Sequence, residues 1–162
     1  MALEIADGNA PAKQAAAPSH GLQPAVAASV QKWHRMVAQG DLSELGSILH
    51  PKAVFRSPMA HTPYASAQAV QLILGTVVKV FEDFTYHREL ASADGLSVVL
   101  EFSANVDGKA LKGIDMVQFD TEGKIVEFEV MVRPMSGLQA LGDEMGKRLA
   151  PYLSAYKAAK AQ

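Results

Sequence analysis

The sequence predicts an α+β fold: a cone-shaped, strongly curved antiparallel sheet wrapped around N-terminal helices, with an additional C-terminal helix. Apolar residues recur at the spacing of amphipathic helices over residues 25–39 and 66–81. Over residues 84–132 the spacing changes to the two-residue alternation of strands. Short turns that contain glycine separate these strands, which is typical of consecutive antiparallel hairpins.

The chain has the length of one domain and enough apolar residues to fill its core. It has 162 residues, of which 49% are hydrophobic. Residues 1–24 are rich in alanine, proline, glycine and glutamine and show no hydrophobic period, so we expect a flexible tail there. Residues 25–162 are expected to form the single domain, including the C-terminal helix.

The first part of the domain is predicted to be helical. The first helix covers residues 25–39, and Gly40 supplies its C-terminal stop. Asp41 can cap a short second helix, which Pro51 ends. A brief strand is expected over residues 53–57.

A loop marked by prolines, residues 57–64, leads to a third helix that Ser66 can cap. The alternating pattern then predicts four strands, over residues 84–90, 96–106, 110–119 and 124–132. Ser136 begins a last amphipathic helix, which Pro151 kinks or restarts.

Composition excludes several classes of protein. The chain contains no cysteine, so disulfides, thiolate metal sites and cysteine nucleophiles are excluded. Its net charge of -2, without long runs of like charge, argues against nucleic acid or an anionic membrane as partner. The most apolar stretch, residues 69–81, is too short to span a bilayer. The first residues are acidic where a signal peptide would be basic, so we expect a cytoplasmic protein.

The histidines outside the proline-marked loop show no metal-ligand spacing, and we predict no bound metal. These histidines are His20, His34, His50 and His87.

Three segments carry a resemblance to a known superfamily. They are VQKWHRMVAQGDL at 30–42, AVFRSPMAHTPYASAQAV at 53–70 and GIDMVQFDTEGKIVEFEVMV at 113–132. In their order and spacing, residues 25–134 resemble the nuclear transport factor 2-like superfamily. Its members include ketosteroid isomerases, SnoaL-type polyketide cyclases, limonene epoxide hydrolases and scytalone dehydratases. The resemblance implies a homodimer and chemistry without a cofactor.

The resemblance to the ketosteroid isomerases covers one of their three catalytic roles. Those enzymes use a general-base Asp and an oxyanion hole formed by a Tyr and a protonated Asp. The base position falls on Ser57, before Pro58, and the tyrosine position falls on Trp33. The protonated Asp falls on Asp115, so the resemblance does not imply a standard ketosteroid isomerase. The epoxide hydrolase pattern would place an arginine at Gly113, whereas a SnoaL-like cyclase needs mainly one acid–base group and a pocket.

Strand alternation places Asp115 on the face that the resemblance turns inward, among hydrophobic neighbours. A buried carboxyl either becomes a neutral donor or finds a partner. A neutral Asp115 could donate a hydrogen bond to a ligand carbonyl or enolate. The alternative is a structural carboxylate bonded to a side chain of the first helix or to backbone.

His61 and Tyr64 are expected at the mouth of the cone. His61 is the residue that could replace the missing base, and the alternative is a solvent-exposed loop histidine. Ser57 could donate a hydrogen bond to a ligand, or could be a structural serine at a strand end. Aromatic residues that could line a ligand cavity, or simply form the core, are Trp33, Phe55, Phe102 and Phe128.

The sequence therefore leads to two hypotheses. In the first, the cone binds an apolar, carbonyl-bearing small molecule, with or without cofactor-free isomerisation, cyclisation or dehydration by proton transfer at Asp115 or His61. In the second, the protein is a non-catalytic ligand-binding or protein-interaction module and Asp115 is structural. In either case we expect a homodimer through the outer sheet face, where Glu129, Met131 and Arg133 alternate.

Overall fold

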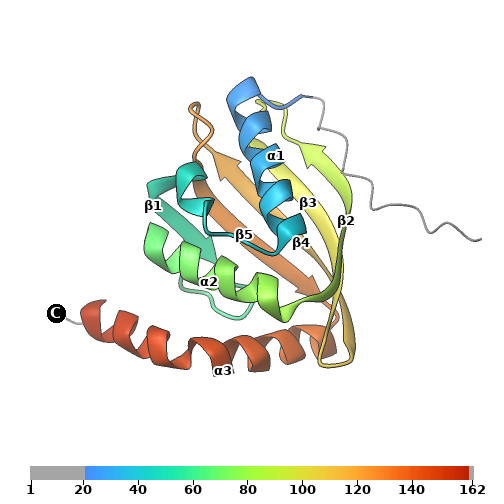
Figure 1. The fold of residues 1–162 in the computed structure, drawn as a ribbon, viewed down its shortest axis with the longest axis vertical. Helices are drawn as coiled ribbons and strands as arrows, with labels where there is room; N and C mark the ends of the chain where they lie inside the picture. The colour runs from blue at the N-terminus through green and yellow to red at the C-terminus, as the bar shows by residue number, and fades with distance from the viewer. Residues whose placement is uncertain (1–20, 161–162) are drawn as a thin grey trace, which may run out of the picture.

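The structure, a computed structural model, describes residues 21–160, without the side chains of residue 153 and residues 155–160. Within this range the chain forms three α-helices, one short 3-10 helix and a five-stranded sheet (Figure 1). The elements are α1 (Pro24–Gln39), η1 (Leu45–Ile48), β1 (Leu49–Arg56), α2 (Ala67–Val80), β2 (Glu82–Ala91), β3 (Ser97–Val106), β4 (Lys109–Phe119), β5 (Ile125–Arg133) and α3 (Met135–Lys160). No helix in the described range is long and apolar enough to cross a membrane.

The strand order is β1-β5-β4-β3-β2, and the four strands from β2 to β5 form the predicted antiparallel meander. The first strand corrects the prediction of a wholly antiparallel sheet, because β1 pairs with β5 in parallel, with Phe55 opposite Phe128. The alternating pattern identifies a strand but not its neighbour, so this pairing across the chain was not predictable from β1 itself.

The curved sheet holds α1 and α2 on one face, and α3 runs past one end of the sheet (Figure 1). Helix α1 ends at Gln39 with Gly40 as its C-cap, as predicted, and Gly40 adopts the left-handed conformation with φ of 66°. Helix α2 has the predicted cap, since the Ala69 N–H donates to Ser66 Oγ at 3.0 Å. The α+β cone expected from the sequence is thus confirmed, with the sheet mixed rather than antiparallel throughout.

The segment after α1 differs from the predicted second helix. Only Leu45–Ile48 is helical, and Leu49 already belongs to β1. Pro51 therefore lies inside a strand and does not end a helix. It sits on an edge strand, between Leu49 and Val54, where the pairing with β5 is irregular. Proline is tolerated at such places because no ladder hydrogen bond is needed from it.

Residues 1–20 of the predicted tail lie outside the described residues. The last residues of the predicted tail are part of the fold. Pro24 is the first residue of α1, and the backbone N–H of Gln23 donates to the Gly95 carbonyl at 3.0 Å. A side chain at Gly95 would meet the Gly21 carbonyl oxygen at 2.7 Å, so a glycine is needed at this close approach.

Candidate functional site

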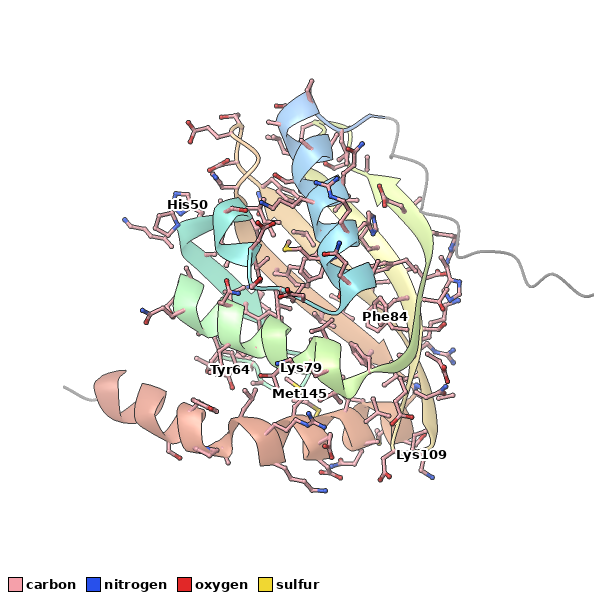
Figure 2. All side chains as sticks on the ribbon, in the orientation of Figure 1. His50, Tyr64, Lys79, Phe84, Lys109 and Met145 are labelled. Carbon is pink, nitrogen blue, oxygen red and sulfur yellow. The ribbon has the colours of Figure 1, made fainter. Side chains whose placement is uncertain are left out.

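A cavity of about 1020 Å³ lies between the inner face of the sheet and all three α-helices. Its volume falls at the upper end of the range of about 300–1,000 Å³ that is usual for small-molecule sites. Helix α3 closes one side of it, and Met145 projects from α3 toward α2 (Figure 2). Most of the wall is apolar, with contributions from Leu42, Phe55, Leu74, Phe81, Phe128 and Met145.

Asp115 is the buried acidic residue of this cavity. Strand β4 alternates between buried and exposed positions, and Asp115 is on the buried side, with 6% of its surface exposed. Its neighbours across the sheet are Leu100 on β3 and Val130 on β5. The carboxyl group therefore stands among apolar side chains, on the inward face that the alternation predicts.

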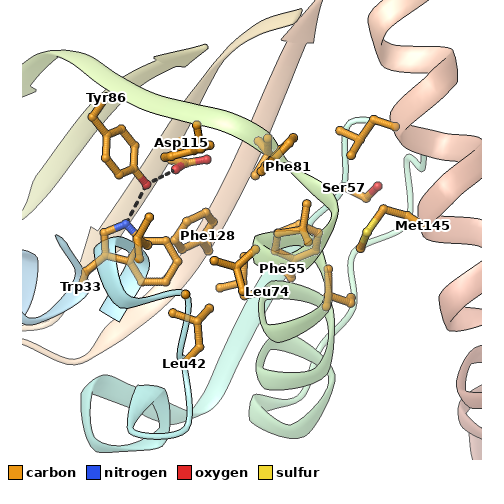
Figure 3. A pocket seen from close by; sticks show the side chains of 18 of the residues that line it. Trp33, Leu42, Phe55, Ser57, Leu74, Phe81, Tyr86, Asp115, Phe128 and Met145 are labelled. Carbon is orange, nitrogen blue, oxygen red and sulfur yellow. Dashed lines mark hydrogen bonds between the residues drawn. The ribbon is translucent and has the colours of Figure 1, made fainter. Parts of the chain in front are cut away.

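A chain of hydrogen bonds ends on Asp115 (Figure 3). The Trp33 Nε1–H donates to the Tyr86 hydroxyl oxygen at 2.8 Å, and the Tyr86 hydroxyl donates to Asp115 Oδ2 at 2.8 Å. Burial raises the pKa of Asp115 to about 7, against the opposing effect of the Tyr86 hydrogen bond. Burial and the charge of Asp115 raise the pKa of Tyr86 well above its usual range. Tyr86 thus stays a proton donor while Asp115 ionises near neutral pH.

Asp115 lines the cavity, and its Tyr86 hydrogen bond uses one of its two carboxyl oxygens. The donors of Trp33 and Tyr86 are both used within the chain, and a phenol has only one proton to give. Within the described part of the chain, no side-chain hydrogen bond uses Asp115 Oδ1. A carboxyl with a pKa near 7 in an apolar cavity can accept or release a proton at physiological pH.

Most of the aromatic and polar residues singled out in the sequence line the cavity together with Asp115. They are Trp33, Phe55, Ser57, Tyr64 and Phe128. Tyr64 is held there because its backbone pairs with Phe55 through two hydrogen bonds of 2.9 Å. Ser57 Oγ accepts the Met59 N–H at 3.1 Å, so the serine hydroxyl keeps its own proton to donate.

Phe102 does not line the cavity, in contrast to what the sequence suggested. Its ring stacks on Phe84 at 5.2 Å and lies 5.5 Å from Phe81. Gly113 makes room for the Phe102 ring, since a Cβ at Gly113 would come within 2.5 Å of it. Phe102 therefore fills the core beside the cavity, and Gly113, the position where the epoxide hydrolase pattern would place an arginine, has a packing role.

His61 is likewise separated from Asp115. It is exposed, and it lines a different hollow of about 330 Å³ with Arg56 and Glu129. His61 is the one ionisable side chain of the loop from Ser57 to Pro63, so this loop brings no ionisable group to the cavity of Asp115. An acid–base role shared between His61 and Asp115 would need the two in one cavity, and the geometry does not provide this.

Two cavity-lining residues, Tyr86 and His34, and the His34 partner Glu89 were not identified as site residues from the sequence. Tyr86 follows Phe84 at the two-residue spacing, so the strand pattern itself could have placed it inward. His34 lines the cavity beside Trp33, and its Nε2 lies 2.7 Å from Glu89 Oε2. Glu89 had no such signal, because a bulge between Tyr86 and Glu89 reverses the alternation of β2.

This chain is similar in sequence to a known domain family and similar in structure to several solved proteins. A model of the SnoaL-like domain matches residues 30–128. A solved structure described as a steroid delta-isomerase from Pseudomonas aeruginosa has 65% sequence identity and a TM-score of 0.81, with 84% of this chain and 99% of that chain covered. No curated protein matches the chain.

Two further solved structures share the fold. An uncharacterised protein from Silicibacter pomeroyi with a cystatin-like fold is 29% identical, with a TM-score of 0.75 over 86% of this chain and 96% of that one. The epoxide hydrolase/cyclase-like enzyme SalBIII is 20% identical, with a TM-score of 0.55 over 68% and 91% of the two chains. The chain belongs to the family of SnoaL-like domain proteins.

Proposed function

We propose that this protein isomerises an apolar ketone by moving a proton between two carbon atoms, with Asp115 as the general base and without a cofactor. The observation that carries the proposal is the position of Asp115: an ionisable carboxyl in an apolar cavity, with a pKa of about 7 and one oxygen open to the ligand.

The apolar walls of the cavity favour a ligand with an apolar carbon skeleton. The carboxylate favours a ligand whose reactive carbon is next to a carbonyl. A carbonyl makes the neighbouring C–H acidic enough for a carboxylate base, provided the enolate is stabilised. The 65% identical protein is described as a steroid delta-isomerase, a name that denotes the shift of a carbon–carbon double bond in a steroid. The reaction class that fits is the conversion of a β,γ-unsaturated ketone to its conjugated isomer.

The proton returns to the substrate in this reaction, so atoms and charges balance. Asp115 Oδ1 takes the proton from the carbon between the carbonyl and the double bond, and the C–H electron pair enters a dienolate. The protonated Asp115 then gives the proton to the far carbon of the former double bond. Tyr86 supports the charged form of Asp115 by donating to Oδ2.

Ser57 takes a binding role in this proposal. It occupies the position at which the ketosteroid isomerase resemblance expects the base, but a serine without a neighbouring base cannot serve as one at neutral pH. Because Ser57 lines the cavity and retains its hydroxyl proton, it can donate a hydrogen bond to an oxygen of the ligand. The proton transfer therefore rests on Asp115.

The test is turnover of a β,γ-unsaturated ketosteroid and of a single-ring β,γ-unsaturated ketone, followed by the ultraviolet absorbance of the conjugated product. We expect kcat/KM to rise with pH through about 7, as Asp115 ionises. Asp115→Asn should lower kcat by about 10²–10⁴-fold, the usual contribution of a general base. Glu122→Gln, which removes an exposed carboxylate in the β4–β5 turn, is the matched control.

Binding of both ketones without turnover at any pH would contradict the proposed reaction and favour the non-catalytic binding module. Thermal stabilisation by the conjugated ketone, lost in Asp115→Asn, would then still assign the cavity as the binding site.

A further inference from the structure

His34 lines the cavity near Tyr86 and pairs with Glu89, which lies outside the lining. His34 Nε2 and Glu89 Oε2 are 2.7 Å apart, and the side chains are only 20% and 10% exposed. The His34 ring meets the Tyr86 ring edge to face, with centroids 5.0 Å apart and an interplanar angle of 85°. Tyr86 thus stands between Asp115, to which it donates, and the His34–Glu89 pair.

Apart from Ser57, which follows β1, the donors that line the cavity beside Asp115 are already used. A dienolate oxygen requires a hydrogen-bond donor or a proton, because negative charge in an apolar cavity is costly without one. Trp33 Nε1–H is committed to Tyr86, and the Tyr86 hydroxyl is committed to Asp115. Neither can serve the substrate without breaking the chain that supports the base.

The contact between His34 and Glu89 uses only one of the two ring nitrogens of His34. A carboxylate can only accept, so an ionised Glu89 holds the histidine tautomer with its proton on Nε2. Among the residues that the structure describes, no hydrogen bond is made by His34 Nδ1. In the neutral ring Nδ1 accepts a proton, and in the protonated ring it donates one. The orientation of a histidine by a carboxylate is a common way to prepare such a group for proton transfer.

We infer that His34, oriented by Glu89, is a second proton-transfer residue of this site and acts on the carbonyl oxygen while Asp115 acts on carbon. The inference rests on the proposed isomerisation. As Asp115 Oδ1 takes the carbon-bound proton, protonated His34 gives its Nδ1 proton to the carbonyl oxygen, and an enol forms. When Asp115 returns its proton to the far carbon, the enol proton goes back to His34 Nδ1 and the carbonyl is restored.

The groups near His34 come from three elements. Strand β2 supplies Glu89, whose Oε2 contacts His34 Nε2, and Tyr86, whose ring meets the imidazole edge to face. Strand β4 supplies Asp115, which is hydrogen-bonded to Tyr86. Helix α1 supplies Arg35, the residue that follows His34. Because the reaction begins with ionised Asp115 and protonated His34, kcat/KM should rise and then fall with pH.

The experiment compares wild type, His34→Ala, His34→Gln and Glu89→Gln in the β,γ-unsaturated ketone assay. We expect His34→Ala to lower kcat about 10²-fold and to remove the fall of kcat/KM at high pH. Added imidazole should restore part of the rate of His34→Ala, and Glu89→Gln should lower kcat by less than His34→Ala does. His87→Ala is the matched control, since His87 is exposed and bonded to Ser103 on the outer face of the sheet.

The outcomes separate the two proposals. Wild-type turnover with an unchanged rate and pH profile in His34→Ala and His34→Gln would overturn the role of His34 and leave Asp115 in place. A loss in His34→Ala without imidazole rescue, with both limbs of the pH profile retained, would make His34 structural and would also overturn the inference. No turnover by wild type would remove the proposed function and this inference together.

Discussion

Asp115 and Glu101 lie on neighbouring strands and are almost equally hidden from water, with 6% and 8% of their surface exposed. Their pKa values nevertheless move in opposite directions. Burial raises the pKa of Asp115 to about 7, whereas the hydrogen bond from Arg88 lowers the pKa of Glu101. The two carboxyl groups point to opposite faces of the same sheet, and both the cost of burying their charge and the partners on those faces differ.

On the outer face, Glu101 is flanked by two cations. Arg88 Nε donates to Glu101 Oε2 at 2.8 Å, and Lys112 Nζ lies 3.3 Å from Oε1. On the inner face, Asp115 receives one hydrogen bond from the neutral Tyr86. Burial raises the pKa of a carboxyl group, and nearby cations oppose that rise. The inner face therefore holds a carboxyl group with a raised pKa, and the outer face holds an ion pair.

The largest effect is expected from Asp115→Asn on the pH dependence of stability. The pKa of Asp115 is raised from 3.8 in the unfolded chain to about 7 in the folded protein. Protonated Asp115 therefore contributes fully to the unfolding free energy below about pH 4. This contribution, of up to about 4 kcal/mol, is lost as the pH rises to about 7. Asp115→Asn should lack this loss. Urea unfolding at several pH values measures it, and parallel pH profiles for the two proteins would contradict a raised pKa.

Tyr86→Phe tests the neutral partner itself. The variant leaves Asp115 without its donor and the Trp33 N–H without its acceptor, which should cost about 1–3 kcal/mol of unfolding free energy. Because the Tyr86 hydrogen bond lowers the pKa of Asp115, that pKa should rise further, as measured by carboxyl NMR. Tyr152→Phe, at an exposed position on α3, is the control. An unchanged Asp115 titration would show that Tyr86 does not influence the carboxyl.

The sequence was sufficient to predict that Asp115 faces inward, because the alternation of a regular strand determines the face of each residue. It was not sufficient for Phe102, whose place depends on which residue lies opposite it in the neighbouring strand. Only the register puts Gly113 opposite Phe102 and lets the ring lie over it. The choice between a filled core and a cavity is therefore made by cross-strand pairs, which local patterns do not contain.

The contact between His34 and Glu89 could likewise not be predicted from local sequence patterns. The contact between His34 and Glu89 joins α1 to β2, and it depends on the bulge that turns Glu89 to the inner face. A regular strand would place Glu89 and Tyr86, three residues apart, on opposite faces. The helices and the meander could be predicted because their signals are local, whereas the site is assembled from long-range pairings.

A smaller effect is expected when the cations of the outer face are removed. In the double variant Arg88→Met, Lys112→Met, the pKa of Glu101 should return toward or above its ordinary value of 4.5. The stability loss should be smaller than in Tyr86→Phe, because both cations are largely exposed and exposed ion pairs contribute little. Carboxyl NMR of Glu101 measures the shift. A depressed pKa that persists in the double variant would assign the cause to something other than these cations.

The smallest effect on stability, and the clearest on assembly, is expected from Met131→Lys. Met116 and Met131 are 40% and 46% exposed on the outer face of β4 and β5, an apolar centre beside charged Glu129 and Arg133. Such a centre with a charged rim is typical of an interface, and we predict a homodimer through this face. Met131→Lys should shift wild-type dimers to monomers in sedimentation velocity, whereas Met135→Lys at the exposed start of α3 should not. The titration of Asp115, on the opposite face, should be unchanged in both variants. A monomeric wild type would contradict the dimer, and an altered Asp115 titration would show that the two faces are coupled.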